Sequence, residues 1–229
     1  MTDETGNRRE PLHRCVAAWI IGSFVGGLLL LWSFGWRRDA AALQRMDAYA
    51  ETGKPLLIVV WHGKYFPLLP MARGRNVAII TNASFRGLII GRVCRIFGYS
   101  PIHIPVKGKA DKMAFIKRAI DSGTRMLAIV PDGPLGPYHI VKSGTVRLAS
   151  EVGFRILPLS VASSPTMVMH KRWDKYEVPP PFARVALEIG EPFDIPADIS
   201  GGVMEQLQED VAEIMLVADA KAEATLERM

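Results

Sequence analysis

The most suggestive residues in this chain are Trp61, His62, Gly63 and Lys64, which directly follow the apolar run 57–60. An apolar run of this kind is typical of a buried parallel strand. In open α/β sheets, ligands bind just beyond the carboxyl ends of the strands. We therefore expect His62 to face a cleft, where a neutral imidazole can act as a general base. The alternative is a core or loop histidine that is held by a hydrogen bond.

Three further predicted strands also end in polar residues. Ser84 and Arg86 follow the strand predicted at 76–81, and Lys107 follows the one predicted at 101–106. The strand at 126–130 leads into a loop rich in glycine and proline, with the sequence Pro131-Asp132-Gly133-Pro134-Leu135-Gly136-Pro137. If these strands are parallel neighbours, the polar side chains meet at one edge of the sheet.

Such a cluster suits a reaction on an anionic substrate that carries a hydroxyl group. His62 would take the hydroxyl proton, while Lys64, Arg86 and Lys107 would hold a phosphate, which arginine can bind bidentately. Backbone N–H groups of the glycine loop would stabilise an oxyanion. Each residue also has an ordinary explanation, because basic side chains at loop ends are usually solvated and an Asp-Gly pair is common in turns.

Other chemistries find less support in the sequence. There is no glycine-rich nucleotide-binding loop and no G-x-S-x-G nucleophile elbow. The five histidines show no spacing with acidic residues that would predict a metal site. Aromatic residues make up 8% of the chain and are scattered, so we expect no nucleic-acid binding. The net charge of +5 favours other anionic partners, such as phospholipid headgroups.

Strands alternate with helices through the middle of the chain. We predict strands at 56–61, 76–81, 101–106, 126–130, 155–161 and 184–189, and helices at 38–51, 65–72, 88–97, 110–120, 143–152 and 202–228. Residues 163–181 show no regular pattern. The alternation predicts an α/β fold with a mainly parallel sheet flanked by helices. We expect two parts, an N-terminal membrane segment at 1–38 and one α/β domain at 39–229.

The N-terminal part contains a long apolar segment. No charged residue occurs at 15–36, and the stretch from Cys15 to Phe34 is long enough to cross a bilayer. Bulky and basic residues follow it, which argues against a cleaved signal peptide. We expect an uncleaved anchor helix that either spans the membrane or lies in one leaflet; a core helix of a soluble enzyme is the alternative. Gly22 and Gly26 have the spacing of a helix-pairing face.

Cysteine usage bears on the compartment. The chain has two cysteines, Cys15 and Cys94, which form neither a disulfide framework nor a zinc-binding spacing. A reducing environment is the simpler explanation. Together with the apolar segment, this predicts a protein of the inner (cytoplasmic) membrane whose main domain faces the cytoplasm.

Several motifs follow one another along residues 40–197, and together they resemble a known bacterial family. They are Trp61-His62-Gly63, the 131–137 loop, Val141-Lys142-Ser143-Gly144, Ile156-Leu157-Pro158, Trp173-Asp174 and Pro181-Phe182. The family is the DUF374 group of the lysophospholipid acyltransferase superfamily. The resemblance implies a glycerol-3-phosphate acyltransferase-like fold with a membrane-associated N-terminus.

The resemblance also implies an activity. A fatty acyl group would pass from acyl-CoA or acyl-carrier protein to a hydroxyl of a lysophospholipid-like lipid, with His62 as general base. The loop with Asp132, Gly133 and Gly136 would contact the phosphate of the acceptor. No metal and no tightly bound cofactor is implied, because the acyl thioester is itself a substrate. The other residues that we expect to bind the anionic headgroup are Lys64, Ser84, Arg86 and Lys107.

The chain departs from the superfamily pattern at the expected acid. An aspartate normally follows the histidine after four intervening residues, and here that position is Pro67. In the segment that usually supplies an acid in this group, Arg86 stands where aspartate is expected. The remaining candidates to orient His62 are a backbone carbonyl, Asp132, Asp111 and Glu151. The alternative function is non-catalytic lipid binding or membrane assembly on the same fold.

Overall fold

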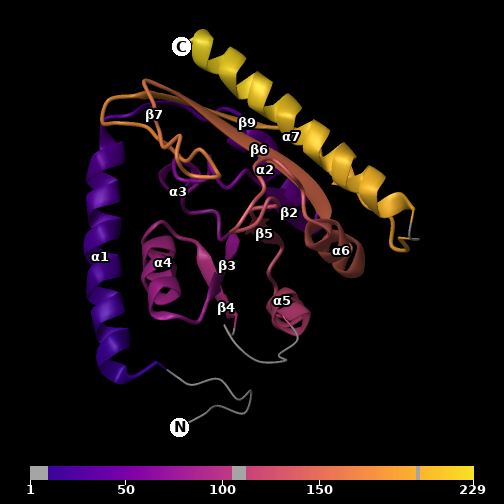
Figure 1. Cartoon of the computed structure of the whole chain (residues 1–229), viewed down its shortest axis with the longest axis horizontal. Helices are drawn as coiled ribbons and strands as arrows, with labels where there is room; N and C mark the ends of the chain where they lie inside the picture. Colours follow the sequence, from indigo (N-terminus) through magenta and orange to yellow (C-terminus); the bar gives the residue numbers. More distant parts are fainter. Residues whose placement is uncertain (1–9, 105–111, 200–201) are drawn as a thin grey trace.

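A mostly parallel β-sheet forms the centre of the molecule, with helices on both of its faces (Figure 1). The computed structural model describes residues 10–104, 112–199 and 202–229. The strands lie side by side in the order β1 (Arg37–Asp39), β9 (Arg184–Ile189), β6 (Arg155–Ser164), β2 (Leu56–Val59), β5 (Met126–Ile129), β3 (Ala78–Asn82) and β4 (Ser100–Ile104).

The central strands run in one direction. β2 pairs in parallel with β5 and β6, and β3 pairs in parallel with β5 and β4. β9 and the short β10 (Phe193–Asp194) pair antiparallel with β6. The predicted α/β fold with a mainly parallel sheet flanked by helices is thereby confirmed. The helices are α1 (Leu12–Phe34), α2 (Leu43–Glu51), α3 (Leu68–Met71), α4 (Phe85–Ile96), α5 (Lys112–Asp121), α6 (Ser143–Val152) and α7 (Val203–Glu227).

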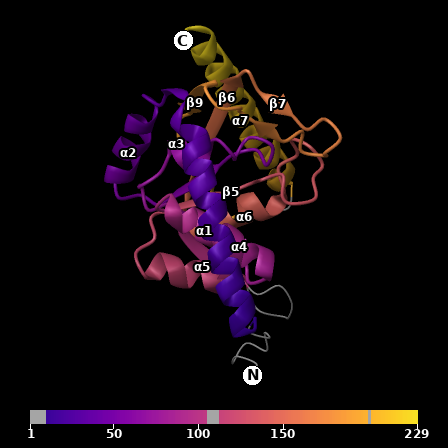
Figure 2. The same ribbon diagram turned by 90° about the vertical axis from the view of Figure 1, so that its left-hand side faces the viewer.

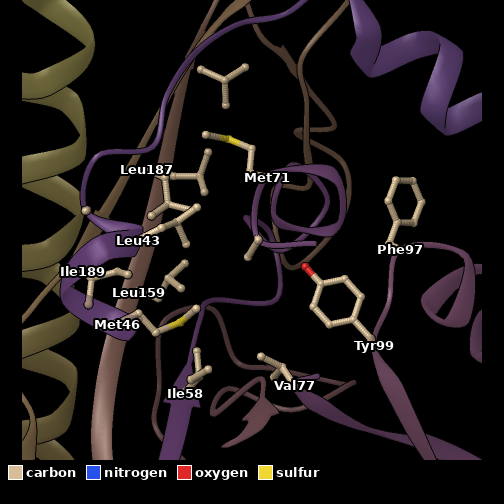
Figure 3. Packing of buried hydrophobic residues seen from close by; sticks show 14 of the residues in the cluster. Leu43, Met46, Ile58, Met71, Val77, Phe97, Tyr99, Leu159, Leu187 and Ile189 are labelled. Atoms are coloured by element: carbon tan, nitrogen blue, oxygen red, sulfur yellow. The ribbon is translucent and has the colours of Figure 1, made fainter. Parts of the chain in front are cut away.

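Each face of the sheet has its own apolar core, because successive strand residues point to opposite faces. In β2, Ile58 shares one core with Met46 of α2 and Met71 of α3 (Figure 3). Leu57 and Val59 belong to the other core, to which α5, α6 and α7 contribute. β2 is therefore buried on both sides, which explains its continuous apolar sequence.

Local sequence explains where several helices begin and end. The hydroxyl oxygen of Ser84 caps α4 by accepting a hydrogen bond from the N–H of Gly87 at 3.2 Å. α6 ends at Gly153, whose φ of 73° is left-handed and therefore suits glycine. α7 carries Glu205 in its first turn, where a negative charge favours the helix dipole.

Helix α1 packs along α4 on the outside of the molecule (Figures 1 and 2). Gly22 and Gly26 lie on the contact side: a Cβ at Gly22 would approach Cβ of Arg92 to 2.6 Å, and one at Gly26 would approach Cδ1 of Ile96 to 2.5 Å. The side chain of Arg92 also donates a hydrogen bond to Ser23 at 2.8 Å. The two glycines therefore let α1 pack closely on α4, a helix of the same chain.

The other side of α1 is an apolar band of exposed side chains, formed by Leu12, Val16, Trp19, Ile20, Phe24, Leu28, Leu31 and Phe34. The helix is long and apolar enough to cross a membrane, and 17% of its most apolar 18-residue window is buried. This low burial disfavours the alternative of a core helix. The domain boundary expected after residue 38 stays a prediction.

Some segments differ from their predicted structure. Residues 37–39 form β1 instead of opening a helix, because hydrogen bonding to β9 outweighs a weak local helix propensity. The segment 163–181, predicted to be irregular, contains a hairpin of β7 (Met167–Val168) and β8 (Glu177–Val178). Residues 105 and 106 of the predicted third strand lie outside the described residues.

Candidate active site

His62 follows β2 at the carboxyl edge of the parallel strands, where its sequence context places it. Its side chain is 19% exposed, and its Nδ1 lies 2.7 Å from Oδ2 of Asp174. Asp174 is 112 residues further along the chain, and its carboxylate is fully buried. An imidazole backed by an orienting carboxylate is the arrangement that general-base catalysis uses.

Arg172 holds the carboxylate of Asp174 with two hydrogen bonds. Nε donates to Oδ1 at 2.8 Å, and Nη2 donates to Oδ2 at 2.6 Å. The hydrogen bonds from Arg172, followed by the one from His62, lower the pKa of Asp174 to about 2 against the effect of burial. An ionised carboxylate only accepts hydrogen bonds, so Nδ1 of His62 must be the donor. In the neutral ring, Nε2 then carries the lone pair that can take a proton.

Two glycines make room for this pairing. A Cβ at Gly63 would lie 2.1 Å from the backbone oxygen of Asp174, so the two backbone segments can approach only because Gly63 has no side chain. A Cβ at Gly136 would lie 2.5 Å from the ring of Trp173, and the φ of Gly136 is left-handed at 68°. Gly63 and Gly136 therefore both leave the space in which residues 173 and 174 pack.

Asp132 contacts His62 through the main chain. The backbone N–H of His62 donates to Oδ1 of Asp132 at 3.1 Å, while the imidazole pairs with Asp174. The expectation that Asp132 orients the ring is corrected accordingly, because its carboxylate bonds to the backbone amide and not to the ring. Burial raises the pKa of Asp132 to about 6, although the hydrogen bond from the N–H of His62 opposes this effect.

Lys64 is buried and bonded to the C-terminal helix. Its Nζ lies 3.3 Å from Oδ1 of Asp219 in α7, and the two side chains are 9% and 11% exposed. Ser160 of β6 donates a hydrogen bond to the same carboxylate oxygen. This placement favours a structural role for Lys64, joining the end of β2 to α7, over the expected contact with an anionic headgroup.

Other predicted site residues have local roles at neighbouring strand ends. Ser84 caps α4, and Arg86 is exposed in the first turn of that helix. Gly133 uses its N–H in a turn, donating to the carbonyl of Val130 at 3.1 Å, so this amide is occupied. In the part of the chain that the structure describes, no hydrogen bond or ion pair joins these residues to His62.

Three further residues were named from the sequence alone. Glu151 lies on α6 and forms an ion pair with Lys117 at 3.8 Å, so it is not the partner of His62. Lys107 and Asp111 lie outside the described residues, and their roles stay predictions. Among the described side chains, no group of three or more His, Cys, Asp or Glu residues is placed to hold a metal ion.

Sequence reasoning assigned no role to Asp174 or Arg172. The pair Trp173-Asp174 was noticed as a motif, but it lies in a segment without periodicity. The signal in the sequence is the motif itself, in which Asp174 has an arginine two residues earlier and Trp173 directly before it. The fold brings this segment to His62, because the N–H of Glu177 in β8 donates to the carbonyl of Gly63 at 2.9 Å. This bond holds the hairpin segment against the end of β2.

Aromatic side chains surround the imidazole. The rings of Trp173 and Tyr65 lie 5.2 and 5.4 Å from the ring of His62, and Tyr176 packs against Tyr65 at 5.4 Å, all between centroids. These rings pack around an imidazole whose own side chain stays 19% exposed. The side chain of Arg172 is 47% exposed and adds a positive charge beside the pair. The arrangement thus combines an imidazole, an orienting carboxylate and an exposed cation.

Comparisons with known proteins give three findings. No protein-family model matches the chain. The chain is similar to the uncharacterized protein RP090 of Rickettsia prowazekii (strain Madrid E), with 26% identity over 149 residues that cover 62% of this chain and 66% of that protein. The structure is similar to the crystal structure of the 1-acyl-sn-glycerophosphate (LPA) acyltransferase PlsC from Thermotoga maritima, with a TM-score of 0.48 and 17% identity, covering 87% of this chain and 77% of that one. The function is therefore inferred from this chain's own site.

Proposed function

We propose that this protein is an O-acyltransferase, which moves a fatty acyl group from acyl-CoA or acyl-carrier protein to a hydroxyl of a lysophospholipid-like lipid. The observation that carries the proposal is the row Arg172, Asp174 and His62 at the carboxyl edge of the parallel strands. These contacts occupy Nδ1 of His62 with Asp174 and place the half-exposed side chain of Arg172 beside the pair. The order of motifs that resembles the DUF374 group supports the same activity.

In the proposed reaction, Nε2 of His62 takes the proton from the acceptor hydroxyl while the hydroxyl oxygen attacks the carbonyl carbon of the thioester. Asp174, which stays ionised, stabilises the imidazolium that forms. The tetrahedral intermediate then collapses, the C–S bond breaks, and the departing thiolate takes the proton from the imidazolium. Arg172 would hold the phosphate of the acceptor beside the base. Ser84 and Arg86 remain candidates for a more distant part of the headgroup.

The alternative of a non-catalytic lipid-binding protein rested on the missing acid and on Arg86, which suits anion binding. Asp174 lies at hydrogen-bond distance from His62, so the first reason no longer holds. A buried carboxylate costs free energy unless it is fully paired, and lipid binding alone has no use for one behind an imidazole. Catalysis is therefore the better explanation of this arrangement.

We also propose that α1 lies along the membrane, with its apolar band in one leaflet. Arg92 of α4 bonds to Ser23 near the middle of α1, and its guanidinium lies 4.6 Å from the ring centroid of Trp19. A spanning α1 would take this arginine into the hydrocarbon, which costs several kcal/mol (about 3 or more). At the inner membrane, with the main domain facing the cytoplasm, the site would meet soluble thioester donors.

Thiol release from acyl-CoA and from acyl-carrier protein, measured with the full chain and a panel of lysophospholipids, tests the activity. We expect H62A and D174N to lower kcat/KM by about 10²–10⁴-fold, the usual contribution of a general base. E151Q is the control, because it also neutralises a carboxylate, and Glu151 pairs with Lys117 on the outside of α6 and not with His62. We expect E151Q to keep most of the activity.

Two results would contradict the proposal. Turnover by H62A at the wild-type rate would remove His62 from the mechanism. A wild-type protein that binds lysolipid but transfers no acyl group from either donor would identify a lipid-binding protein instead.

A further inference from the structure

A cavity lies at the C-terminal end of α1. Its volume is about 590 Å³, within the range of small-molecule sites. Residues that line it include Leu30, Phe34, Trp36, Pro70, Arg38 and Arg73. Trp36 is held in place because its indole N–H donates to the carbonyl of Pro180 at 2.9 Å. The cavity is therefore part of the folded structure, with one apolar side and two cations.

Two arginines, Arg38 and Arg73, supply the positive charge of this cavity. Among the residues that the structure describes, neither Arg38 nor Arg73 forms an ion pair with a carboxylate. Arg38 donates to the carbonyl of Ser33 and lies 6.0 Å from the ring centroid of Trp36. Partial burial and the neighbouring charge of Arg73 both lower the pKa of Arg38, although a guanidinium remains charged. An anion between the two arginines would relieve their repulsion.

The cavity borders the apolar band of α1. Leu31 and Phe34 line the cavity and are 76% and 87% exposed. Phe182 is 77% exposed and packs against Gly35, where a Cβ would meet its ring at 2.6 Å. A ligand at this place would contact apolar side chains and two guanidinium groups together. That combination fits an amphiphile with an anionic head.

Aromatic side chains separate this cavity from the candidate active site. Trp36 packs against Phe66 at 6.4 Å, and Phe66 packs against Tyr176 at 6.2 Å, both between ring centroids. Tyr176 in turn contacts Tyr65, which lies against His62. Neither His62, Asp174 nor Arg172 lines the cavity, so a lipid held there would contact other residues than an acceptor on which His62 acts.

We propose that the cavity binds an anionic glycerophospholipid of the bilayer, whose phosphate is held by Arg38 and Arg73 and whose acyl chain lies against Leu30 and Phe34. The bound lipid fixes the end of α1 at the membrane surface. The site does not depend on acyl transfer by His62, so either proposal can fail without the other.

Vesicle binding by the full chain tests this site. Vesicles of phosphatidylcholine are compared with vesicles that also contain phosphatidylglycerol, at one ionic strength. We expect the wild type to bind the anionic vesicles more tightly. R38Q/R73Q should bind them about 30-fold more weakly than the wild type, which is the factor for two basic side chains at an anionic surface. The control R37Q/R125Q removes the same charge at exposed positions that do not line the cavity, and it should keep the preference.

Two outcomes would overturn the proposal. If both double variants lost the same affinity for anionic vesicles, the binding would be a general attraction of a basic protein to an anionic surface. A second experiment adds inorganic phosphate or glycerol phosphate to proteins bound to the anionic vesicles. Release of the wild type and of R37Q/R125Q to the same extent would assign the cavity to a free phosphate. Thermal melting of each variant checks that both arginine pairs are replaced in a folded protein.

Discussion

At the scale of single residues, Arg172 decides the charge of the carboxylate behind His62. Its hydrogen bonds are the largest cause of the lowered pKa of Asp174. A carboxyl group whose folded pKa lies below its unfolded value stabilises the fold above the unfolded pKa, near 4, and this contribution is lost as the pH falls toward the folded pKa, about 2. The whole shift corresponds to about 2 kcal/mol. Solvent screens part of it, because the side chain of Arg172 is 47% exposed.

R172Q should raise the pKa of Asp174 and lower the free energy of unfolding by about 1 kcal/mol at neutral pH. R172K keeps the charge without the bidentate geometry, so its free energy of unfolding should lie between those of the wild type and of R172Q. Urea unfolding at neutral pH and near pH 2 measures the effect, and the difference from wild type should shrink at the lower pH. A difference that does not change with pH would instead mean that Arg172 acts by packing over the ring of Tyr176, from whose centroid it lies 5.0 Å away.

Gly63 carries a second prediction at this scale. In G63A the new methyl group would meet the backbone oxygen of Asp174 at 2.1 Å, and neither backbone can move freely. We expect the free energy of unfolding to fall by about 1–3 kcal/mol, the cost of overpacking, and acyl transfer to fall with it. G27A is the control, because nothing lies within 4 Å of a Cβ at that helical position. A melting temperature of G63A equal to that of wild type would contradict the close approach.

At the scale of elements, α1 presents two unlike sides, of which one packs on α4 and the other is the apolar band. The variant F24D/L28D changes two side chains of this band that are 73% and 51% exposed. We expect its affinity for vesicles to fall about 10-fold or more, since two apolar side chains no longer enter the bilayer. Its melting temperature should stay near that of wild type, because neither side chain is buried in the protein.

L135D is the matched control for this change. Leu135 is 88% exposed, but it lies in the 131–137 loop and not on α1. Flotation of both variants with vesicles compares them directly. An equal loss of binding in L135D would show that α1 has no special part in membrane association.

At the scale of the whole molecule, the pair of Lys64 and Asp219 joins the active-site edge of the sheet to the C-terminal helix, which runs across β6 and β9 (Figure 1). Both groups are largely buried, so removing one leaves the other charge uncompensated. K64M should therefore lower the free energy of unfolding by about 3–5 kcal/mol. The double variant K64M/D219L should lose less than the sum of the two single changes, which urea unfolding of all four proteins measures. Strict additivity would mean that the two side chains are not coupled.

Several features of this fold follow from local patterns. The apolar run before His62 predicted a buried parallel strand, because a strand with both faces covered has no polar positions. The alternation of strands and helices predicted the α/β fold. β1 and β10 escaped prediction, since strands of three and two residues exist only through their pairing with β9 and β6.

By itself, the sequence determined that His62 follows a buried parallel strand and that residues 15–34 form an apolar helix. Only the tertiary structure decided that Asp174 is the partner of the imidazole, that Lys64 pairs with Asp219, and that the glycines of α1 face α4. The physical reason is the distance along the chain over which each feature is decided. Periodicity and chain direction are set by neighbouring residues, whereas a hydrogen bond requires two atoms within about 3 Å. His62 and Asp174 are 112 residues apart, and the hairpin of β7 and β8, held against Gly63, brings them together.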